Sequence, residues 1–372
     1  MDSFHLGHAI AEHWHGAASE VCRQLGTLPS DTNLGLLYVS DAFVTDLDAI
    51  VDYLKHQTGV PHWVGSTGVG ICANTQEYYA ESAIAVLVGS LPGNSFRVFS
   101  AVKDDLHDFS RDHRRWYQEG ASHFAIVHGD PGNAETPALI AALAHELPGG
   151  FLAGGIASSR TVAAQVADEV TRGGLSGVMF SSKVAVMTRL TQGCSPIGPV
   201  REVTHCERNI AMRIDGRPAL DVFQEDIGEL LARDMSRAAG YIFAGLPIRG
   251  SDTGDYLVRN LLGVDRKNRL LAIGDLLHPG DPIMFCRRDA HTAREDMERM
   301  LLDVKRHITA PPRAGVYFSC LGRGGVFFGE NSAEQKMIRE HLGDIPLAGF
   351  YANGEISHDR LYGYTGVLAL FL

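Results

Sequence analysis

The sequence predicts a mixed α/β fold, with repeated βαββ units that form two helix-covered sheets or domains. Unbroken apolar stretches of strand length alternate with amphipathic stretches, and this alternation favours sheets covered by helices on at least one face. The same order of elements recurs after roughly ninety to a hundred residues, which indicates a duplicated unit. The length of 372 residues is more than one hydrophobic core usually serves, so we expect two domains.

The first unit begins with the apolar stretch 34–39, which we expect to be a buried strand. Apolar residues spaced three and four apart follow, and this spacing predicts an amphipathic helix. They are Leu47, Ile50, Val51 and Leu54. Thr45 and Asp48 have the capping-box pattern at the start of that helix. A strand at 62–66 that leads into a glycine-rich bend, and an apolar strand at 83–88, complete the unit.

The second unit repeats this order. The apolar stretch 124–127 precedes a helix with Pro137 in its first turn, a position that suits proline. The stretches 151–155 and 177–180 match the glycine-bearing strand and the closing strand of the first unit.

The last unit ends the chain. It starts with a strand at 316–320, and Ser332 with Gln335 forms a second capping-box pattern for the helix that follows. A glycine-bearing strand at 345–349 and an apolar closing strand at 366–371 come next.

The stretch 202–222 between these units predicts a hairpin or a crossover turn, because the pair Asp215 and Gly216 favours a tight turn. A degenerate fourth copy of the glycine-bearing strand could lie at 241–247. We place a domain boundary near residue 225. The expected division is an N-terminal helical extension over 1–32, an N-terminal domain over 33–225 and a C-terminal domain over 226–372.

Composition narrows the range of expected partners and locations. The formal net charge is −11, and an acidic surface repels phosphate groups, so we expect neither nucleic acid nor an anionic membrane as a partner. The first residues lack the features of a signal peptide, and no apolar stretch is long enough to span a bilayer. The six cysteines are scattered without a CxxC pair, which favours reduced thiols and a cytoplasmic location.

Three motifs in these units resemble the FIST family. The region 33–89, with VGSTGVGI at 64–71, resembles the FIST N-terminal domain. The segments VYFSCLGR at 316–323 and PLAGFYANGEI at 346–356 resemble the FIST C-terminal domain. The similarity runs from about residue 33 to the C-terminus, and the combination of SCLGRG with GFYANGEI is specific.

This resemblance implies a sensory domain of bacterial signal transduction that binds small ligands such as amino acids. Relatives are fused to chemoreceptor, histidine-kinase or cyclic-dinucleotide output domains. This chain leaves no stretch for an output domain, so we expect a separate signalling protein, a histidine kinase or a cyclic-dinucleotide enzyme, as its partner. Some members are described as haem proteins that sense nitric oxide. Haem binding therefore stays open as an alternative, with an axial ligand from among the seventeen histidines.

Arg323 is the leading candidate anchor for a small anion or zwitterion, because its planar guanidinium suits a carboxylate or a phosphate and the glycines beside it let a ligand approach. Glu355 could hold the amine of the same ligand, or it could form a structural ion pair with Arg323. The bend after residue 65 could present N–H groups to an anion or could be a tight turn. The expected ligand-binding residues are Arg323, Glu355, Tyr351, Cys320, Gly349, Gly354, Ser66 and Thr67.

Cys320 supports a third hypothesis, a thiol-dependent enzyme. A thiol at a strand end beside an arginine could be activated, because cationic neighbours lower its pKa. A buried free cysteine is more often a small apolar residue. We expect no other catalytic residue and no metal site. The receptor hypothesis requires that the glycine-bearing bends of the units meet and leave room for a ligand.

Overall fold

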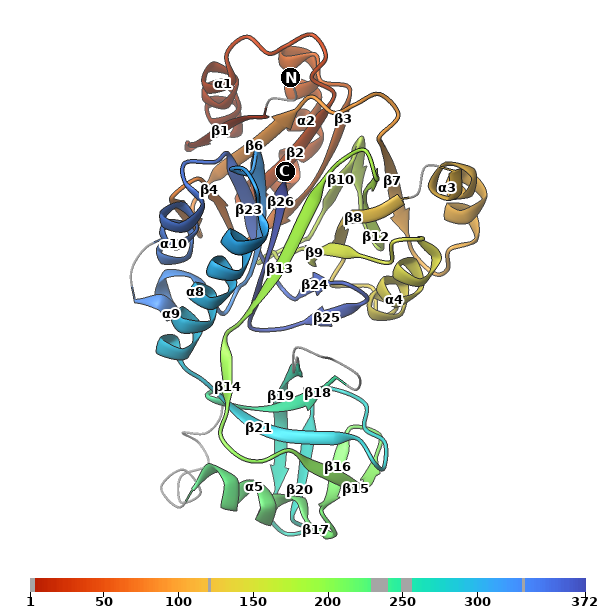
Figure 1. The fold of residues 1–372 in the computed structure, drawn as a ribbon, viewed down its shortest axis with the longest axis vertical. Coiled ribbons are helices and arrows are strands. Elements are labelled where there is room, and N and C mark those ends of the chain that lie inside the picture. Colours follow the sequence, from red (N-terminus) through yellow and green to blue (C-terminus); the bar gives the residue numbers. More distant parts are fainter. Residues whose placement is uncertain (1–3, 120–121, 229–239, 249–255, 330–331) are drawn as a thin grey trace. The chain divides into compact units, whose positions relative to one another are not determined.

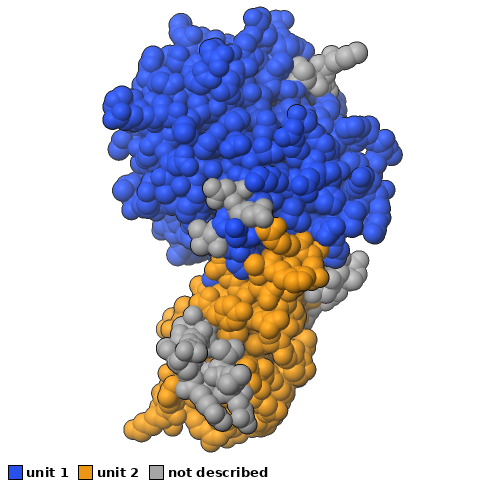
Figure 2. All heavy atoms as spheres, turned by 90° about the vertical axis from the view of Figure 1, so that its left-hand side faces the viewer, with its two compact units in different colours: residues 1–191, 297–372 blue, residues 192–296 orange. Residues whose placement is uncertain are grey.

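The computed structural model describes residues 4–119, 122–228, 240–248, 256–329 and 332–372. Within these residues the chain forms two compact units (Figure 2). Unit 1 comprises residues 1–191 and 297–372, and unit 2 comprises residues 192–296. The boundary that we expected near residue 225 therefore lies inside unit 2. None of the described helices is long and apolar enough to cross a membrane.

The described part of unit 1 contains three copies of one arrangement (Figure 1). Each copy adds an edge strand and a helix in front of the repeated unit that the sequence predicts. The first copy consists of β1 (Phe4–Ile10), α1 (Trp14–Leu25), β2 (Leu34–Ser40), the 3-10 helix η1 (Asp41–Asp46), α2 (Leu47–Thr58), β3 (His62–Gly68), β4 (Gly70–Ala73), β5 (Gln76–Tyr79) and β6 (Ala83–Gly89).

The second copy has the same order of elements. It consists of β7 (Phe96–Val102), α3 (His107–Glu119), β8 (Ser122–Gly129), α4 (Thr136–Glu146), β9 (Leu152–Ile156), β10 (Gln165–Ala167), β11 (Glu169–Thr171) and β12 (Leu175–Ser181). Pro137 occupies the first turn of α4, as its sequence position predicts.

The third copy is interrupted, because unit 2 is inserted after its edge strand. It consists of β13 (Val186–Gln192), α8 (Ala290–His307), β22 (Ala314–Cys320), α9 (Gly324–Phe328), α10 (Ala333–Leu342), β23 (Leu347–Ala352), β24 (Glu355–Ser357), β25 (Arg360–Tyr362) and β26 (Thr365–Phe371). The insertion explains why the sequence repeat is clear in the first half of the chain and resumes only near its end.

The copies exchange hairpins. In the described residues of unit 1 the strands form three six-stranded sheets, in the orders β1-β6-β2-β3-β10-β11, β25-β24-β9-β8-β12-β7 and β13-β26-β22-β23-β4-β5. Each sheet holds the edge, first, second and closing strands of one copy and the hairpin of another copy. The first two strands of each copy are parallel, and the exchanged hairpin extends the sheet beside the second strand.

Helices cover one face of each sheet, and the opposite faces meet in a shared core. Alternate residues of β2 show the pattern, because Leu37 and Val39 pack against α1 and α2 whereas Leu36 and Tyr38 enter the shared core. Helices α3 and α4 cover the second sheet, and α8 and α10 cover the third. Burial on both faces accounts for the unbroken apolar runs in the sequence.

Unit 2 is an antiparallel barrel with one main helix in its described residues. β15 (Arg201–Glu207), β16 (Ile210–Ile214), β20 (Leu270–Ile273), β19 (Tyr256–Asp265), β18 (Ile242–Pro247) and β21 (Pro282–Arg288) pair in a closed ring. β14 (Cys194–Pro196) and β17 (Arg217–Pro218) add to it. On α5 (Ala219–Ile227), Phe223 packs against Phe285 with ring centroids 4.8 Å apart.

The mixed α/β class and the repeated unit are confirmed, and several finer expectations are corrected. The two compact units agree with the two expected domains, whereas the described residues of unit 1 alone hold three helix-covered sheets. Residues 1–32 contribute the strand β1 as well as a helix. The predicted hairpin exists as β15 and β16, with Asp215 and Gly216 at the next turn. The stretch 241–247 forms β18 of the barrel and is not a fourth copy.

Neither predicted capping box forms. The residue before α2 is Asp46, whose side chain makes no capping hydrogen bond, and the Thr45 hydroxyl bonds to Asp46 instead. Ser332 precedes α10 with a φ of 60° and also makes no capping bond, while the Gln335 side chain donates to the Tyr351 hydroxyl. A contact with the neighbouring residue replaces the expected pattern at α2, and a tertiary contact replaces it at α10.

The glycine of each second strand occupies one equivalent position. A Cβ atom at Gly65, Gly154 or Gly349 would lie 1.8 Å from the carbonyl oxygen of the residue opposite on the parallel first strand. Those residues are Leu37, Val127 and Tyr317. The atom that would clash with the Cβ belongs to the backbone in each case. Rotating a neighbouring side chain therefore cannot make room for a side chain at these positions.

We expect Gly349→Ala to destabilise the protein by about 3 kcal/mol or more, because overpacking against backbone cannot relax cheaply. Gly65→Ala and Gly154→Ala should behave alike. The matched control is Gly16→Ala in α1, where the nearest atom to the added Cβ is 3.4 Å away and a gain of about 0.5–1 kcal/mol is expected. Urea denaturation measures all four variants. A Gly349→Ala variant as stable as the wild type would contradict the assigned strand register.

Candidate functional site

The glycine-bearing bends of the three copies meet and bond to one another. The Val69 amide donates to the Ser158 hydroxyl over 2.9 Å, and this hydroxyl donates to the Tyr351 carbonyl over 2.5 Å. The Ile156 amide donates to the Gly354 carbonyl over 2.8 Å, and the Asn353 amide donates to the Ile156 carbonyl over 2.9 Å. This part of the receptor hypothesis agrees with the structure.

Side chains fill the space where the first strands converge. Tyr38, His128 and Phe318 occupy the same position in the three first strands, and Phe350 from β23 packs against all three. The ring centroids of these contacts lie 5.4–5.9 Å apart, and all four side chains are fully buried. The expected hollow between the copies is therefore closed at this point, because aromatic rings pack there at core density.

His128 is the candidate axial ligand for haem that we compare with its surroundings, because it is the one fully buried histidine among the described residues. Burial lowers its pKa to about 3, so the imidazole is neutral, as an axial ligand must be. Its Nε2 lies 3.4 Å from the Tyr38 hydroxyl, and its Nδ1 has no partner among the described residues. The rings of Tyr38, Phe318 and Phe350 leave no slot for a porphyrin beside it, so these surroundings do not fit haem.

Arg323 forms its ion pair with Glu334 on α10, and not with Glu355 as one of the two interpretations of the sequence expected. The Arg323 Nε atom donates to Glu334 Oε1 over 2.8 Å, and both side chains are 1% exposed. Tyr317, Ser319 and the Gly324 amide complete the set of donors to Glu334 at 2.6, 2.8 and 3.3 Å. Four donors therefore satisfy the buried carboxylate of Glu334.

A second carboxylate fixes the glycine-rich segment after β22. Glu77, on the exchanged strand β5, accepts hydrogen bonds from the amides of Gly325 and Ser332, each over 2.9 Å. Neither Glu77 nor Glu334 was predicted from the sequence to be part of this site. The one available indication was the position of Glu334 in the helix that follows SCLGRG, whereas nothing in the sequence connects Glu77 with a segment that lies far along the chain.

Glu355 lies at the start of β24, fully buried and without a bond to Arg323. Its Oε2 accepts hydrogen bonds from the amide and the hydroxyl of Thr365, at 3.0 and 2.7 Å. Its Oε1 has no partner among the described residues. Burial raises the pKa of Glu355 to about 8, even though Thr365, Arg323 and Cys320 favour the charged form. The carboxyl group is therefore mostly protonated at neutral pH.

Cys320 lies beside Glu355 with the surroundings of a structural thiol. Burial, followed by the charge of Glu355, raises its pKa above the ordinary value, although Arg323 acts in the opposite direction. Ser40 and Asp130 occupy its position in the other copies, and each accepts a backbone N–H near the start of a closing strand, from Ala83 and Gly173. The protonated thiol gives the enzymatic hypothesis no support.

The other expected site residues make structural contacts within or between copies. The Tyr351 hydroxyl accepts the side-chain N–H of Gln335 over 3.1 Å. The Thr67 hydroxyl and the backbone of Ala164 exchange two hydrogen bonds of 3.1 Å, and the Ser66 hydroxyl donates to the Thr67 carbonyl. Gly354 adopts a φ of 145°, which favours glycine. The structure thus brings Arg323, Cys320 and Glu355 together and places Ser66 and Thr67 at another contact.

Two hollows on the described surface lie away from Arg323, Cys320 and Glu355. One, between β4 and α10, has a volume near 10 Å³ and is lined by residues that include Asn74, Gln335 and Leu347. It could hold about one water molecule. The other is an open groove along α3 between His107 and Glu119. Among the described residues, no three His, Cys, Asp or Glu side chains gather into a set that could hold a metal ion.

The buried ion pair should dominate local stability. We expect Arg323→Met and Glu334→Gln each to cost about 3–5 kcal/mol, because each leaves one buried charge without its partner. The double variant should cost clearly less than the sum of the two. Urea denaturation at pH 7 measures the cycle. Arg115→Ala, which breaks the exposed pair with Glu119, is the control and should change stability by about 0.5 kcal/mol or less. Additive single effects would show that the pair is not coupled.

Glu355 should make stability depend on pH. Its pKa is higher in the folded protein than the ordinary value of 4.5, so the folded state retains a proton that the unfolded state loses as the pH rises from about 4.5 to 8. Between these values the free energy of unfolding of the wild type should fall relative to Glu355→Gln, by up to about 1.4 kcal/mol per pH unit. Denaturation of both proteins between pH 5 and pH 9 measures this. Parallel pH profiles would refute the raised pKa.

The chain is similar to mycobacterial proteins over most of its length. The chain is 31% identical over 324 residues to the uncharacterized protein Rv0628c of Mycobacterium tuberculosis, covering 83% of each chain. It is 27% identical over 360 residues to the uncharacterized protein Mb0898c of Mycobacterium bovis, covering 93% of this chain and 92% of that protein. The FIST N domain matches residues 33–217 and the FIST C domain matches residues 219–358. The chain therefore belongs to the FIST family.

Proposed function

We propose that this protein is a small-ligand sensor whose ligand, an amino acid or another small zwitterion or anion, binds between Arg323 and Glu355. FIST domains are associated with small-ligand sensing in signal transduction. The observation that carries the proposal is a pair of buried polar atoms, Arg323 Nη2 and Glu355 Oε1, which have no hydrogen-bond partner among the described residues. Such atoms cost free energy unless a water molecule or a ligand satisfies them.

One of the two atoms is a hydrogen-bond donor and the other is an acceptor, and this difference indicates the class of ligand. The guanidinium donates and suits a carboxylate, and the Glu355 carboxylate accepts and suits an ammonium group. The two side chains influence each other, since the charge of Arg323 opposes the rise in the pKa of Glu355. A zwitterion that spans them would satisfy both atoms at once, whereas an anion would satisfy Arg323 alone.

Both atoms are covered by protein, so a ligand enters only when the segment after β22 opens. Glu77 and Glu334 hold this segment through the amides of Gly324, Gly325 and Ser332. A ligand carboxylate would compete with Glu334 for Arg323, and this competition would link binding to the position of α10. A separate signalling protein, such as a histidine kinase or a cyclic-dinucleotide enzyme, would detect that change.

Thermal-shift screening with amino acids and small carboxylates, followed by calorimetry, tests the proposal. We expect at least one compound to stabilise the wild type. Binding of a zwitterion should release a proton, because its ammonium group favours ionised Glu355, whose pKa of about 8 leaves it protonated at pH 7. The affinity should therefore rise between pH 6 and pH 8 and then level off.

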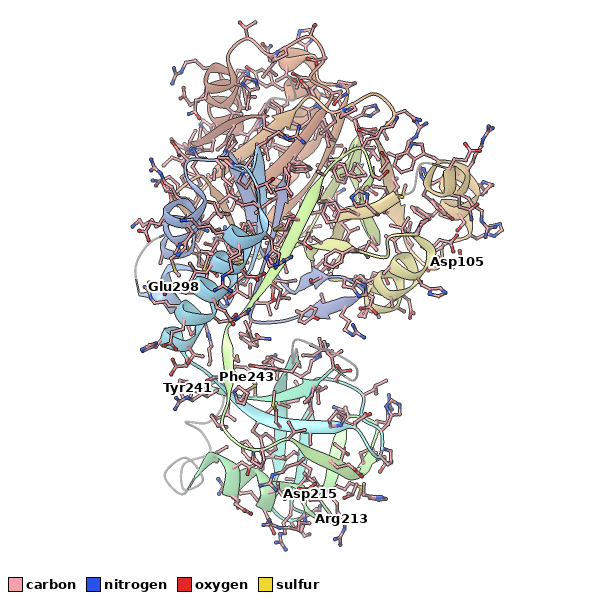
Figure 3. The ribbon with its side chains drawn as sticks, in the orientation of Figure 1. Asp105, Arg213, Asp215, Tyr241, Phe243 and Glu298 are labelled. Carbon is pink, nitrogen blue, oxygen red and sulfur yellow. The ribbon has the colours of Figure 1, made fainter. Side chains whose placement is uncertain are left out.

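The variant Glu355→Gln keeps the shape of the side chain and should lose the pH dependence and most of the affinity for a zwitterion. The matched control is Glu298→Gln on α8, where the side chain is exposed (Figure 3) and binding should be unchanged. A ligand that binds both variants equally well would exclude this site. Failure of every compound to stabilise the wild type would remove the support for a zwitterion sensor.

A further inference from the structure

In the second copy, three neighbouring buried side chains each carry a polar atom that has no hydrogen-bond partner among the described residues. These atoms are His128 Nδ1 on β8, Ser176 Oγ on β12 and Gln165 Oε1 on β10, and all three side chains are fully buried. Such an atom destabilises the folded protein unless a hydrogen bond replaces the one that water makes in the unfolded chain. None of the three belongs to the pair Arg323 and Glu355.

Strand register places these side chains on two sheet faces that meet. Ser176 lies directly opposite His128 in the antiparallel pair of β12 with β8, so both side chains point to the same side of the second sheet. Gln165 lies opposite Ser66 in the first sheet. The residues two positions away on β8, β12 and β3 belong to the shared core, so both rows point into it. They are Ile126, Val178 and Val64.

Two contacts join the rows, and β10 lies beside β12 (Figure 1). The Gln165 side-chain amide donates to the carbonyl of Gly174 over 3.3 Å, and Gly174 precedes Ser176 by two residues, about 7 Å along an extended strand. From the first sheet, the Tyr38 hydroxyl lies 3.4 Å from His128 Nε2. The three unpartnered atoms are therefore near one another without bonding directly, which is the arrangement that a bridging molecule completes.

The chemistry of the three atoms defines that molecule. The Gly174 carbonyl fixes the orientation of the Gln165 amide, because an oxygen in place of Nε2 would face another acceptor, so Gln165 Oε1 can only accept. The Ser176 hydroxyl donates or accepts, and the neutral His128 imidazole presents one donor or one acceptor at Nδ1. The bound molecule must therefore be uncharged and must donate. It must also be very small, because aromatic rings pack around His128.

We propose that His128 Nδ1, Ser176 Oγ and Gln165 Oε1 together hold an internal water molecule. The water donates to Gln165 Oε1 and bonds to the other two atoms, which gives it three hydrogen bonds, the usual number for a buried water. It connects the exchanged hairpin of the second copy with β8 and β12, and so it joins the first sheet to the second. Gln165 and Glu355 occupy the same position in their copies, so the water site is the uncharged counterpart of the niche around Glu355.

The other copies lack this polar set and show which residues the fold accepts in its place. The position of Ser176 holds Ala85 opposite Tyr38 in the first copy, and Val367 opposite Phe318 in the third. Alanine and valine therefore both fit a closing strand at this point. Substituting them for Ser176 changes the polarity of the site without introducing a residue that is foreign to the fold.

Two measurements on the full-length chain count the water directly. A crystal structure that resolves ordered water should show a density peak about 2.6–3.2 Å from all three atoms. In solution, oxygen-17 magnetic relaxation dispersion counts the water molecules that stay in the protein for longer than its tumbling time. Ser176→Val should hold one fewer of these than the wild type, because the added methyl group occupies the space. The crystal structure of the wild type decides the proposal if this variant fails to fold.

Ser176→Ala distinguishes a hydrated hydroxyl from a dry one. The variant loses a hydrogen bond to water, so its apparent unfolding temperature should fall by about 2–4 °C. Removal of a hydroxyl without any partner would instead leave the unfolding temperature unchanged or raise it. The matched control is Ser181→Ala on the same strand, whose buried hydroxyl accepts the Lys183 amide over 3.4 Å. It should retain every long-lived water of the wild type.

Three results would overturn the proposal. The first is the absence of a water peak at His128, Ser176 and Gln165 in a structure that shows ordered water elsewhere in the core. The second is an equal number of long-lived waters in Ser176→Val and the wild type. The third is an unfolding temperature of Ser176→Ala that equals or exceeds that of the wild type.

Discussion

The exchange of hairpins between copies is the constraint on which unit 1 depends. Each hairpin leaves its own copy at the glycine-bearing bend and pairs with the second strand of another copy, as β4 does with β23. A copy by itself would leave one strand edge unpaired and one hairpin without a partner, and unpaired backbone groups are costly once buried. The three copies are therefore expected to fold as one cooperative body, with a single core shared by their inner faces.

The same exchange determines which residues meet at the candidate site. Ile71, Gln165 and Glu355 occupy one position in the three exchanged hairpins, opposite Phe350, Ser66 and Gly155. The side chain at this position is apolar in the first copy, an amide in the second copy and a carboxyl group in the third copy. The amide of Gln165 bonds to the carbonyl of Gly174, near the start of a closing strand, much as Glu355 bonds to Thr365. The chemistry of the site comes from changes in the third copy at positions that are structural in the others.

Buried charge is the physical cost of that change. Arg323 and Glu334 lie out of water and stabilise each other only because Tyr317, Ser319 and a backbone amide complete the donors around the carboxylate. Glu355 has fewer donors, and its raised pKa expresses the difference. A carboxyl group that stays close to its point of ionisation at neutral pH can respond to a nearby charge, which is the property that the proposed sensor uses.

The sequence by itself determined the local elements. The apolar stretch at 34–39, the apolar spacing of residues 47–54 and the recurrence of both predicted the strands, the helices and the repeat, because these patterns reflect burial on one face or two. The motif around SCLGRG also predicted that Arg323 is suited to bind a carboxylate or a phosphate. Only the tertiary structure decided which carboxylate it binds, which hairpin joins which sheet, and that unit 2 interrupts the third copy. Each of these depends on contacts between residues far apart along the chain, such as Glu77 with Gly325, and no local pattern records a contact of that kind.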